Sequence, residues 1–405
     1  MAARTIATIV EELRHECIQS IQKQLMEDGD VIYDADSEQA IALLEAEVVN
    51  VIVSSGDKLD HVDRVWYDVA DLMVRVALRR QFQDENAPSI NPIALPVLRL
   101  TKILCTLYQT FFSHGGTDQP TNVDRWAATM IHACSFYLSS APYTSNECQA
   151  FCLEIIEVLP DLLRHRSRAF QSSDDLFSRY FTRVLSLFAS KSSKEEWIAT
   201  QSAAPYAFRW MVRHVTFPHF ENEVIGRIFA LALPLLDQVT VSTQVIGLDV
   251  VHHVVRQATA TDIRWYTDIL LLEMQQTLVT ASSSPDFLRA TLDCLSDTLA
   301  VVSVQGDVQH YDRFFPSLVR QWDMSLEVPV KQVMTVGIRP WIQAMGAPHS
   351  LQLLRYLQPL VKVTLGCLES TPLQREGLET LRLVVLAAWI RMPHHVEEIT
   401  LGILK

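Results

Sequence analysis

Apolar residues recur along most of the chain at steps of three and four, which is the spacing of an amphipathic α-helix. The segment 244–302 shows this pattern in three successive stretches. The first stretch carries two apolar stripes, so its helix is apolar over most of its circumference and must be covered by neighbours. The stripes of the three stretches are Val241, Val245, Leu248, Val251 and Val255 with Ile246, Val250 and Val254; then Tyr266, Leu270, Met274 and Leu278; then Leu288, Leu292, Leu295, Leu299 and Val302.

Short polar breaks with helix-start signals separate these stretches. Ser284–Asp286 supplies an N-cap hydroxyl, a proline at the first helical position and an acidic first turn. Thr371 and Pro372 repeat the hydroxyl-then-proline start, and Thr144 with Glu147 matches a capping box. The breaks therefore predict separate helices joined by short turns.

The helical runs cover most of the chain and become regular in its second half. Earlier runs lie near 37–54, 60–82, 93–112, 122–140, 145–164 and 173–189. From Phe220 onward, helix pairs begin near 220, 262, 308 and 348, and a period of about 40 to 46 residues is typical of HEAT and armadillo repeats. The sequence predicts an all-α fold, an α-solenoid of HEAT- or armadillo-like helical repeats.

The domain prediction is a single continuous α-solenoid over 1–405, because 405 residues exceed what one compact core usually holds, roughly 250 to 300 residues. A sub-boundary is placed at the loop 113–121, between an N-terminal helical part (1–112) and a C-terminal HEAT-like part (122–405). Gly115-Gly116 in that loop follows no strand and precedes no Gly-Lys-Ser/Thr, so it is interpreted as a connection and not as a phosphate cradle.

Composition and charge narrow the class of protein. Apolar residues make up 49% of the chain and only 12 glycines are present, which fits a helical array. The net charge of −13 argues against a protein that mainly binds nucleic-acid phosphates. Much of the excess is local, since 27–63 carries eleven acidic residues and one lysine. This segment is interpreted either as a solvated helix face with acidic loops or as a site for a basic partner.

Cysteine usage and hydropathy bear on the compartment. Seven cysteines, an odd number, are scattered mostly within apolar helical runs, as in reducing compartments. The longest apolar run, Ile228–Leu236, is nine residues long, well short of the roughly 18 that indicate a membrane span. Glu11 and Glu12 precede any apolar signal core. We expect a soluble protein of the cytoplasm, or of cytoplasm and nucleus, with no membrane partner.

Candidate chemistry is sparse, and the sequence predicts no catalytic, metal-binding or cofactor-binding residue. His132, Cys134, Cys148 and Cys152 come closest to a metal-ligand set, but apolar neighbours favour buried thiols that act as small hydrophobes. The pair His252-His253 projects about 100° apart on a helix, and His252 is interpreted as a satisfied core histidine.

One basic cluster is present, formed by Arg164, His165, Arg166, Arg168, Arg179 and Arg183. No interleaved aromatic residues provide a platform for nucleic-acid bases, so a solvated surface or an acidic-peptide site remains and no nucleic-acid partner is predicted.

Four short sequence motifs in the C-terminal half resemble those of a known family, the second Tel-two-interacting protein, a subunit of the TTT co-chaperone complex. The first three are Gly247–Val255, Asp262–Tyr266 and Leu292–Leu295. The fourth, Leu378–Arg382 leading into Ala388–Pro393, is similar to the family's Trp-Pro-Arg-Ile-Pro signature, with isoleucine and methionine in place of its first proline and its isoleucine.

This resemblance implies an all-helical scaffold that joins two larger helical-repeat subunits and, with a heat-shock chaperone, helps to mature phosphatidylinositol-three-kinase-related kinases. The alternatives are a HEAT-repeat adaptor in nuclear transport or in assembly of another complex, and, third, an all-helical enzyme. The enzyme would need a cleft with perturbed acids or histidines.

Five residues are predicted to bind a partner: Arg264, Trp265, Trp389, Ile399 and Ile403. For Trp265 the first interpretation is a buried ring between repeats, whose loss costs about 3 to 5 kcal/mol; an exposed ring would make it a partner anchor. The helices predicted near 371–391 and 393–405 end on apolar residues, and we expect them to form a docking surface. The alternatives are that these residues fold back on the preceding pair, or that the natural chain continues.

Overall fold

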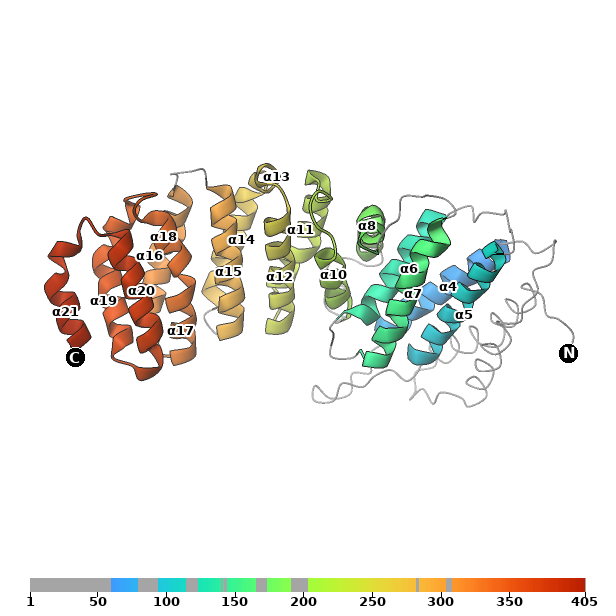
Figure 1. The fold of residues 1–405 in the computed structure, drawn as a ribbon, viewed down its shortest axis with the longest axis horizontal. Coiled ribbons are helices and arrows are strands. Elements are labelled where there is room, and N and C mark those ends of the chain that lie inside the picture. The colour runs from blue at the N-terminus through green and yellow to red at the C-terminus, as the bar shows by residue number, and fades with distance from the viewer. Residues whose placement is uncertain are drawn as a thin grey trace, which may run out of the picture. The chain divides into compact units, whose positions relative to one another are not determined.

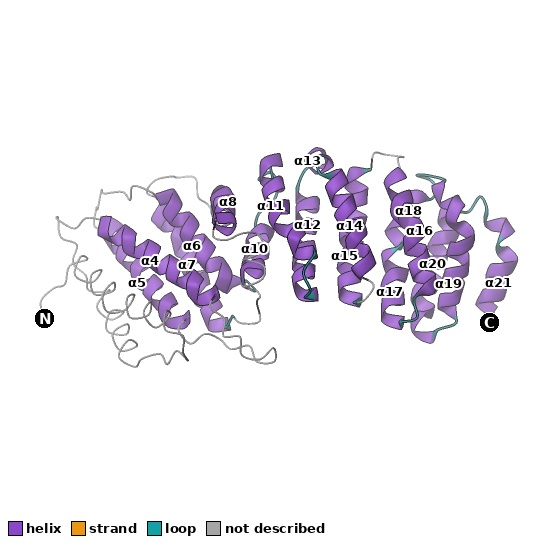
Figure 2. Ribbon diagram, turned by 180° about the vertical axis from the view of Figure 1, so that it is seen from behind, coloured by secondary structure: helices purple, strands orange, loops and turns teal. Residues whose placement is uncertain are grey.

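All elements of the computed structural model are helices, and no strand occurs in the part of the chain that it describes (Figure 2). That part comprises residues 60–78, 94–113, 123–139, 141, 144–164, 173–190, 203–281, 284–303 and 308–404. The predicted all-α fold is thereby confirmed. The chain divides into two compact units, Met1–His219 and Phe220–Lys405, so the single continuous solenoid and the boundary at the loop 113–121, of which 114–121 lies outside the described residues, stay predictions.

The described helices of the first unit are α4 (Asp60–Leu78), α5 (Ala94–Ser113), α6 (Val123–Leu138), α7 (Asn146–Arg164), α8 (Ser173–Ser190) and α10 (Ala203–Arg213). Helix α6 lies at the centre of these helices, where it contacts α4, α7, α8 and α10, and α5 packs on α4 and α7. Trp66 of α4 stacks on Trp126 of α6 with ring centroids 3.8 Å apart, and both rings are buried. Bulky aromatic burial of this kind fixes one helix pairing. The predicted runs from 60 to 189 agree with these helices to within about four residues.

The predicted capping box at Thr144 is wrong by one residue. Helix α7 begins at Asn146, and the hydroxyl of Ser145 accepts the hydrogen bond from the backbone N–H of Cys148, at 3.1 Å. The hydroxyl of Thr144 instead donates to the carbonyl of Ala141, at 2.9 Å. Two neighbouring hydroxyl residues can each cap a helix, so composition alone does not decide between them.

The second unit consists of helix pairs that follow one another in chain order (Figure 1). Its elements are α11 (Asn222–Leu236), α12 (Val241–Gln257), α13 (Ala260–Arg264), α14 (Thr267–Ala281), α15 (Pro285–Val302), α16 (Gln309–Met324), α17 (Val328–Gly337), α18 (Arg339–Met345), η2 (Gln352–Tyr356), α19 (Leu357–Leu368), η3 (Thr371–Leu373), α20 (Gln374–Ala387), η4 (Met392–His394) and α21 (Val396–Leu404). The predicted pair starts near 220, 262, 308 and 348 lie within four residues of the starts of α11, α13, α16 and η2.

The pairs form two rows. The first-helix row contains α11, α14, α16, α19 and α21, and the second-helix row contains α12, α15, α17 and α20. Within a pair the two helices contact each other, as α11 does α12 and α19 does α20, and along the second-helix row α12, α15, α17 and α20 pack side by side. Stacked pairs whose contacts run mainly to their neighbours are the arrangement of an α-solenoid, as predicted.

Two predicted helix starts have a different local geometry. Ser284 occupies the N-cap of α15 and Pro285 follows it, but the Ser284 hydroxyl makes no capping hydrogen bond. The segment that begins at Thr371 opens as the short 3-10 helix η3, and α20 follows from Gln374. Proline fixes its own φ without an N–H donor, so it starts a helix even where the hydroxyl before it does not cap.

Candidate partner-binding surface

The predicted burial of Trp265 is wrong, because its side chain is 75% exposed. Helix α13 ends at Arg264, and Trp265 is its C-cap residue, with φ −64° and ψ −23°. Ile263 and Leu270 are the residues that point into the core here. Since Trp265 lies two helical residues after Ile263, its ring projects about 200° away from that side chain. Arg264 is also exposed, so the structure leaves the partner-anchor interpretation of this pair open.

Replacing Trp265 by alanine should change the free energy of unfolding by no more than about 0.5 kcal/mol, because surface side chains contribute little to stability. Urea denaturation followed by circular dichroism measures the change. A loss of 3 kcal/mol or more would mean that the ring is buried in solution.

The C-terminal end of the second unit exposes apolar side chains from α20, η4 and α21. Trp389 is 63% exposed and follows the C-cap of α20. Helix α21 contains no buried residue, with Ile403 exposed and Ile399 half-buried. The other exposed apolar residues of this end are Leu378, Leu386, Ile390, Val396, Leu401 and Leu404. Exposed apolar residues that gather at one end of a soluble protein often serve in binding.

A groove of about 550 Å³ runs between α19, α20 and α21, and we call it the C-terminal groove. It is lined by Leu368, Glu369, Gln374, Leu378, Gly402 and Ile403. Its lining combines leucine and isoleucine side chains with one carboxylate and one amide, a mixture of apolar and polar groups that is usual where proteins bind each other. Of the predicted site residues, Ile403 lines this groove, and sequence reasoning missed the five others.

Helix α21 folds back on α19, which was one of the predicted alternatives, yet it leaves the groove uncovered. The two helices approach closely at Gly402, where an added Cβ atom would lie 2.7 Å from Cδ2 of Leu365. Glycine therefore permits the close approach of the two helices. Only one side of α21 contacts the preceding pair. The other side stays exposed, so the helix folds back and still contributes to the apolar surface.

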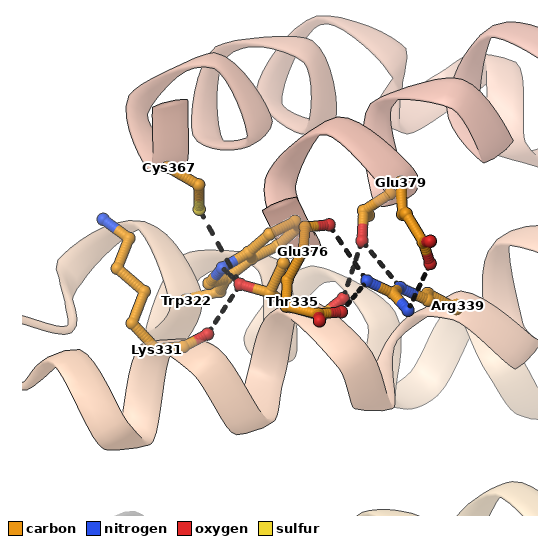
Figure 3. Close-up of polar contacts among 8 residues, drawn as sticks. Trp322, Lys331, Thr335, Arg339, Cys367, Glu376 and Glu379 are labelled. Atoms are coloured by element: carbon orange, nitrogen blue, oxygen red, sulfur yellow. Dashed lines mark hydrogen bonds and ion pairs between the residues drawn. The ribbon is translucent and has the colours of Figure 1, made fainter. Parts of the chain in front are cut away.

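A network of polar side chains joins α20 to the helices that precede it (Figure 3). Arg339, at the start of α18, donates from Nε to the hydroxyl of Thr380 at 3.0 Å and from Nη2 to the carbonyl and the carboxylate of Glu376. Its Nη1 reaches Glu379 at 3.2 Å. A guanidinium in several charge-assisted hydrogen bonds holds its partners in one geometry.

The network continues through two threonines into the second-helix row. The hydroxyl of Thr380 donates to the carbonyl of Thr335 at 2.9 Å, and the Thr335 hydroxyl accepts a hydrogen bond from Trp322 Nε1 at 3.0 Å and donates to the carbonyl of Lys331. Thr335, Thr380 and Trp322 are all buried. Helix α20, which carries part of the C-terminal surface, is thus tied to α16, α17 and α18.

The residues considered for metal binding pack as core side chains. His132 lies edge-on to the rings of Phe136 and Phe188, with centroids 5.3 and 4.6 Å away. Burial raises the pKa of the Cys148 and Cys152 thiols, so both stay neutral, whereas a metal ligand or nucleophile needs the thiolate. Across the described ranges, no three His, Cys, Asp or Glu side chains are grouped so that they could hold a metal ion.

The other polar candidates are engaged in pairs. His252, interpreted as a satisfied core histidine, is half-buried, and its Nε2 lies 2.7 Å from Oδ2 of Asp297, which gives it a polar partner. Arg183 of the basic cluster pairs with Asp124 at 3.3 Å, while 165–172 of that cluster lie outside the described residues. The acidic segment 27–63 also lies outside them, except for the first turn of α4. None of the described helices is long and apolar enough to cross a membrane.

Comparison with known proteins finds relatives with one name. The chain is 24% identical over 281 residues to TELO2-interacting protein 2 of Mus musculus, which covers 65% of this chain and 53% of the mouse protein. The protein of that name from Rattus norvegicus is 24% identical over 294 residues, 68% of this chain and 56% of the rat protein. The chain thus spans about half the length of the curated relatives it matches. No protein-family model matches it.

Among solved structures, the karyopherin Kap121p bound to the SUMO protease Ulp1p aligns over 95% of this chain and 39% of its own length, with a TM-score of 0.43 and 11% identity. Kap121p bound to Pho4p aligns with a TM-score of 0.41 and 13% identity, over 95% of this chain and 42% of its own length. Scores this low support no assignment, so the fold rests on the helices described above. The predicted resemblance is confirmed by the curated relatives: over about two thirds of its length, the chain is similar to TELO2-interacting protein 2.

Proposed function

We propose that this protein is a non-catalytic scaffold subunit of a TTT-type complex, and that its C-terminal surface binds another helical-repeat protein. The observation that carries the proposal is the apolar surface around the C-terminal groove, with Trp389 and Ile403 exposed and the groove open between three helices. The name of the relatives, which describes proteins that interact with TELO2, supports a helical-repeat partner of that kind.

The cellular role in this proposal is to help a heat-shock chaperone to mature phosphatidylinositol-three-kinase-related kinases, in the cytoplasm or in both cytoplasm and nucleus. Its support is the similarity to the TELO2-interacting proteins. The scaffold has no catalytic step of its own, which fits an array of helix pairs whose polar side chains serve to join one helix to the next.

The geometry favours a helical partner. Helices form the sides of the groove, and helices also form every contact between successive pairs of the second unit. In the second unit each pair covers the apolar side of the preceding pair, as α19 and α20 cover α16, α17 and α18. A helix pair of another protein that packs against α20 and α21 would extend this pattern, and Trp389 and Ile403 would be buried in the contact. Buried aromatic and aliphatic anchors at the centre of an interface provide most of its free energy.

The test is recovery of the TELO2-type helical-repeat partner with full-length protein that carries Ile399→Asp and Ile403→Asp. We expect recovery to fall at least about tenfold, because two charges at an apolar contact cost well over 1.4 kcal/mol. Ile399 is half-buried, so circular dichroism must show that the variant is folded. A second variant, Ile403→Asp with Leu404→Asp, changes exposed residues only.

The matched control adds the same two charges elsewhere, with Gln332→Asp and Gln358→Asp on exposed positions of α17 and α19. The control should bind as the wild type does. Undiminished recovery with both C-terminal variants would contradict the proposal.

A further inference from the structure

Helix α14 is apolar on two opposite sides, only one of which packs against the protein. The packed side carries Leu270, Met274 and Leu278, all buried. On the other side a stripe begins at the end of α13 and continues along α14 at steps of four, three, four and three. We call it the α14 stripe, and its residues are Trp265, Ile269, Leu272, Gln276 and Val279, all exposed.

The neighbouring helices α16 and α19 of the same row carry polar residues on their outer sides in place of an apolar stripe. The exposed positions of α16 include Arg320 and Asp323, and those of α19 include Gln358 and Lys362. Lys362 and Asp323 also pair with each other across the two helices, at 3.4 Å. Polar residues on the outer side are usual for a solenoid helix in water, so the α14 stripe is a local exception.

The spacing of the stripe matches one kind of occupant. Steps of four and three are the a and d positions of a heptad, which form the seam of two helices packed at about 20°. Within α14 the seam from Ile269 to Val279 is roughly 15 Å long at 1.5 Å per residue, about three helical turns, and Trp265 precedes it in the turn between α13 and α14. A single polar residue in such a seam, here Gln276, fixes the register of the partner at some cost in stability. A flat or extended ligand would need no such period.

Charges beside the stripe define the chemistry of the occupant. Glu273 lies on one flank, where burial, and then the charge of Asp237 on the neighbouring helix end, raise the pKa of its carboxyl group. Two acidic groups that repel each other at the edge of an apolar seam favour a partner with basic residues there. On the opposite flank Arg313 is already engaged, since its Nε and Nη2 donate to Oε1 of Gln275 at 2.9 and 2.6 Å.

We propose that the α14 stripe is a second docking surface, which binds one amphipathic helix of a partner protein. The helix presents apolar residues in heptad spacing to the stripe, and Lys or Arg residues to Glu273 and Asp237. Trp265, 75% exposed at one end of the seam, is the anchor that becomes buried on binding. This surface is distinct from the C-terminal groove, because α16 and α19 lie between α14 and α21 in the first-helix row. The inference therefore does not depend on the proposed function.

The first experiment identifies the occupant by its chemistry. The photoreactive residue p-benzoylphenylalanine is placed at position 276 of the full chain, and crosslinked segments are sequenced by mass spectrometry; position 358 on α19 serves as the control. We expect one partner segment with apolar residues at steps of three and four and Lys or Arg along one flank. Crosslinks to this chain itself, to a second copy of it, or to segments without that pattern would overturn the proposal, as would yields no higher than at position 358.

The second experiment tests the contact with a synthetic peptide of the segment so identified, titrated by fluorescence anisotropy. Leu272→Asp should weaken binding at least tenfold, whereas Gln358→Asp and the Ile399→Asp, Ile403→Asp variant should leave it unchanged, which separates this site from the C-terminal one. Glu273→Lys should weaken binding several-fold, and a peptide with glutamate in place of the facing basic residue should restore it. Absence of this rescue, or an unchanged affinity with Leu272→Asp, would contradict the inference.

Discussion

Replacing Trp341 by alanine is expected to destabilise the second unit by about 3 to 5 kcal/mol, the range for loss of a fully buried aromatic side chain. Its ring is buried and meets the rings of Tyr311 and Phe314 edge-on, with centroids 5.9 and 6.4 Å away. Its Nε1 donates to the hydroxyl of Ser296 at 2.7 Å. One side chain thus joins α18 to α15 and α16, so its removal leaves a cavity among three helices, and the Ser296 hydroxyl keeps only its hydrogen bond to the carbonyl of Leu292.

Urea denaturation followed by circular dichroism measures this effect. Because the chain has two compact units, two unfolding transitions are expected. Trp341→Ala should shift only the transition of the second unit. Trp66→Ala, in the first unit, should shift the other. The matched control is Trp389→Ala, the same substitution at an exposed position, with a change of no more than about 0.5 kcal/mol. Equal effects of Trp341→Ala and Trp389→Ala would contradict the assigned burial.

Periodicity predicts the helices because each helix is a local structure. The runs predicted at 60–82 and 93–112 correspond to α4 and α5 with ends that differ by at most four residues. Apolar residues at steps of three and four require a covering neighbour, and in a chain of helices the neighbour in sequence provides it. Fold class, helix order and pair spacing can therefore be predicted from the sequence alone.

Trp265 shows where periodicity fails. The stripe through Tyr266, Leu270 and Met274 continues smoothly in the sequence, but the backbone breaks between Arg264 and Thr267, and Ile263 takes the buried position. A turn of this kind changes which side of the helix faces the core without changing the spacing of apolar residues. The steps of seven from Trp265 to Leu272 and Val279 were the available signal for the α14 stripe, but a seam and a core stripe have the same period.

The C-terminal groove could not be predicted, since it depends on contacts between distant residues. It exists because α21 reaches back to α19, where Gly402 meets Leu365, and because α20 is held by residues of α17 and α18. The contacts between residues of different helices depend on the angles at which the helices pack, and the apolar pattern within one helix does not give these angles. The sequence therefore pointed to the apolar C-terminal end, whereas the groove itself appears only in the structure.

Replacing Arg339 by alanine is expected to destabilise the second unit by about 2 to 4 kcal/mol, somewhat below the range for a fully buried charge that loses its partner. The side chains of Arg339 and Glu376 are 18% and 25% exposed. Without the guanidinium, the Glu376 carboxylate would be left with little solvent and no cation in this contact, and the Thr380 hydroxyl would lose its donor. Arg339→Lys keeps the charge but cannot donate to three acceptors in one plane, so an intermediate loss of about 1 to 2 kcal/mol is expected.

Two controls show whether the network acts as a unit. Glu379, which Arg339 also contacts, is 58% exposed, so Glu379→Gln should cost no more than about 0.5 kcal/mol. In a double-mutant cycle, Arg339→Ala and Glu376→Ala should together cost less than the sum of the two single changes by at least about 1 kcal/mol, because each single change leaves a partner unpaired. Additive costs would mean that the contact contributes nothing of its own.

The same substitution tests how the interior supports the proposed docking surface. Arg339 bonds to the first turns of α20, whose Gln374 and Leu378 line the C-terminal groove. If α20 is held less firmly, recovery of the helical-repeat partner should fall, although no groove residue has changed. A mobile binding surface must first become ordered, and the free energy of that ordering lowers the affinity. Recovery should fall with Arg339→Ala at a temperature where the variant is still folded, and it should be restored in part by Arg339→Lys. Full recovery with folded Arg339→Ala protein would show that the groove does not depend on this network.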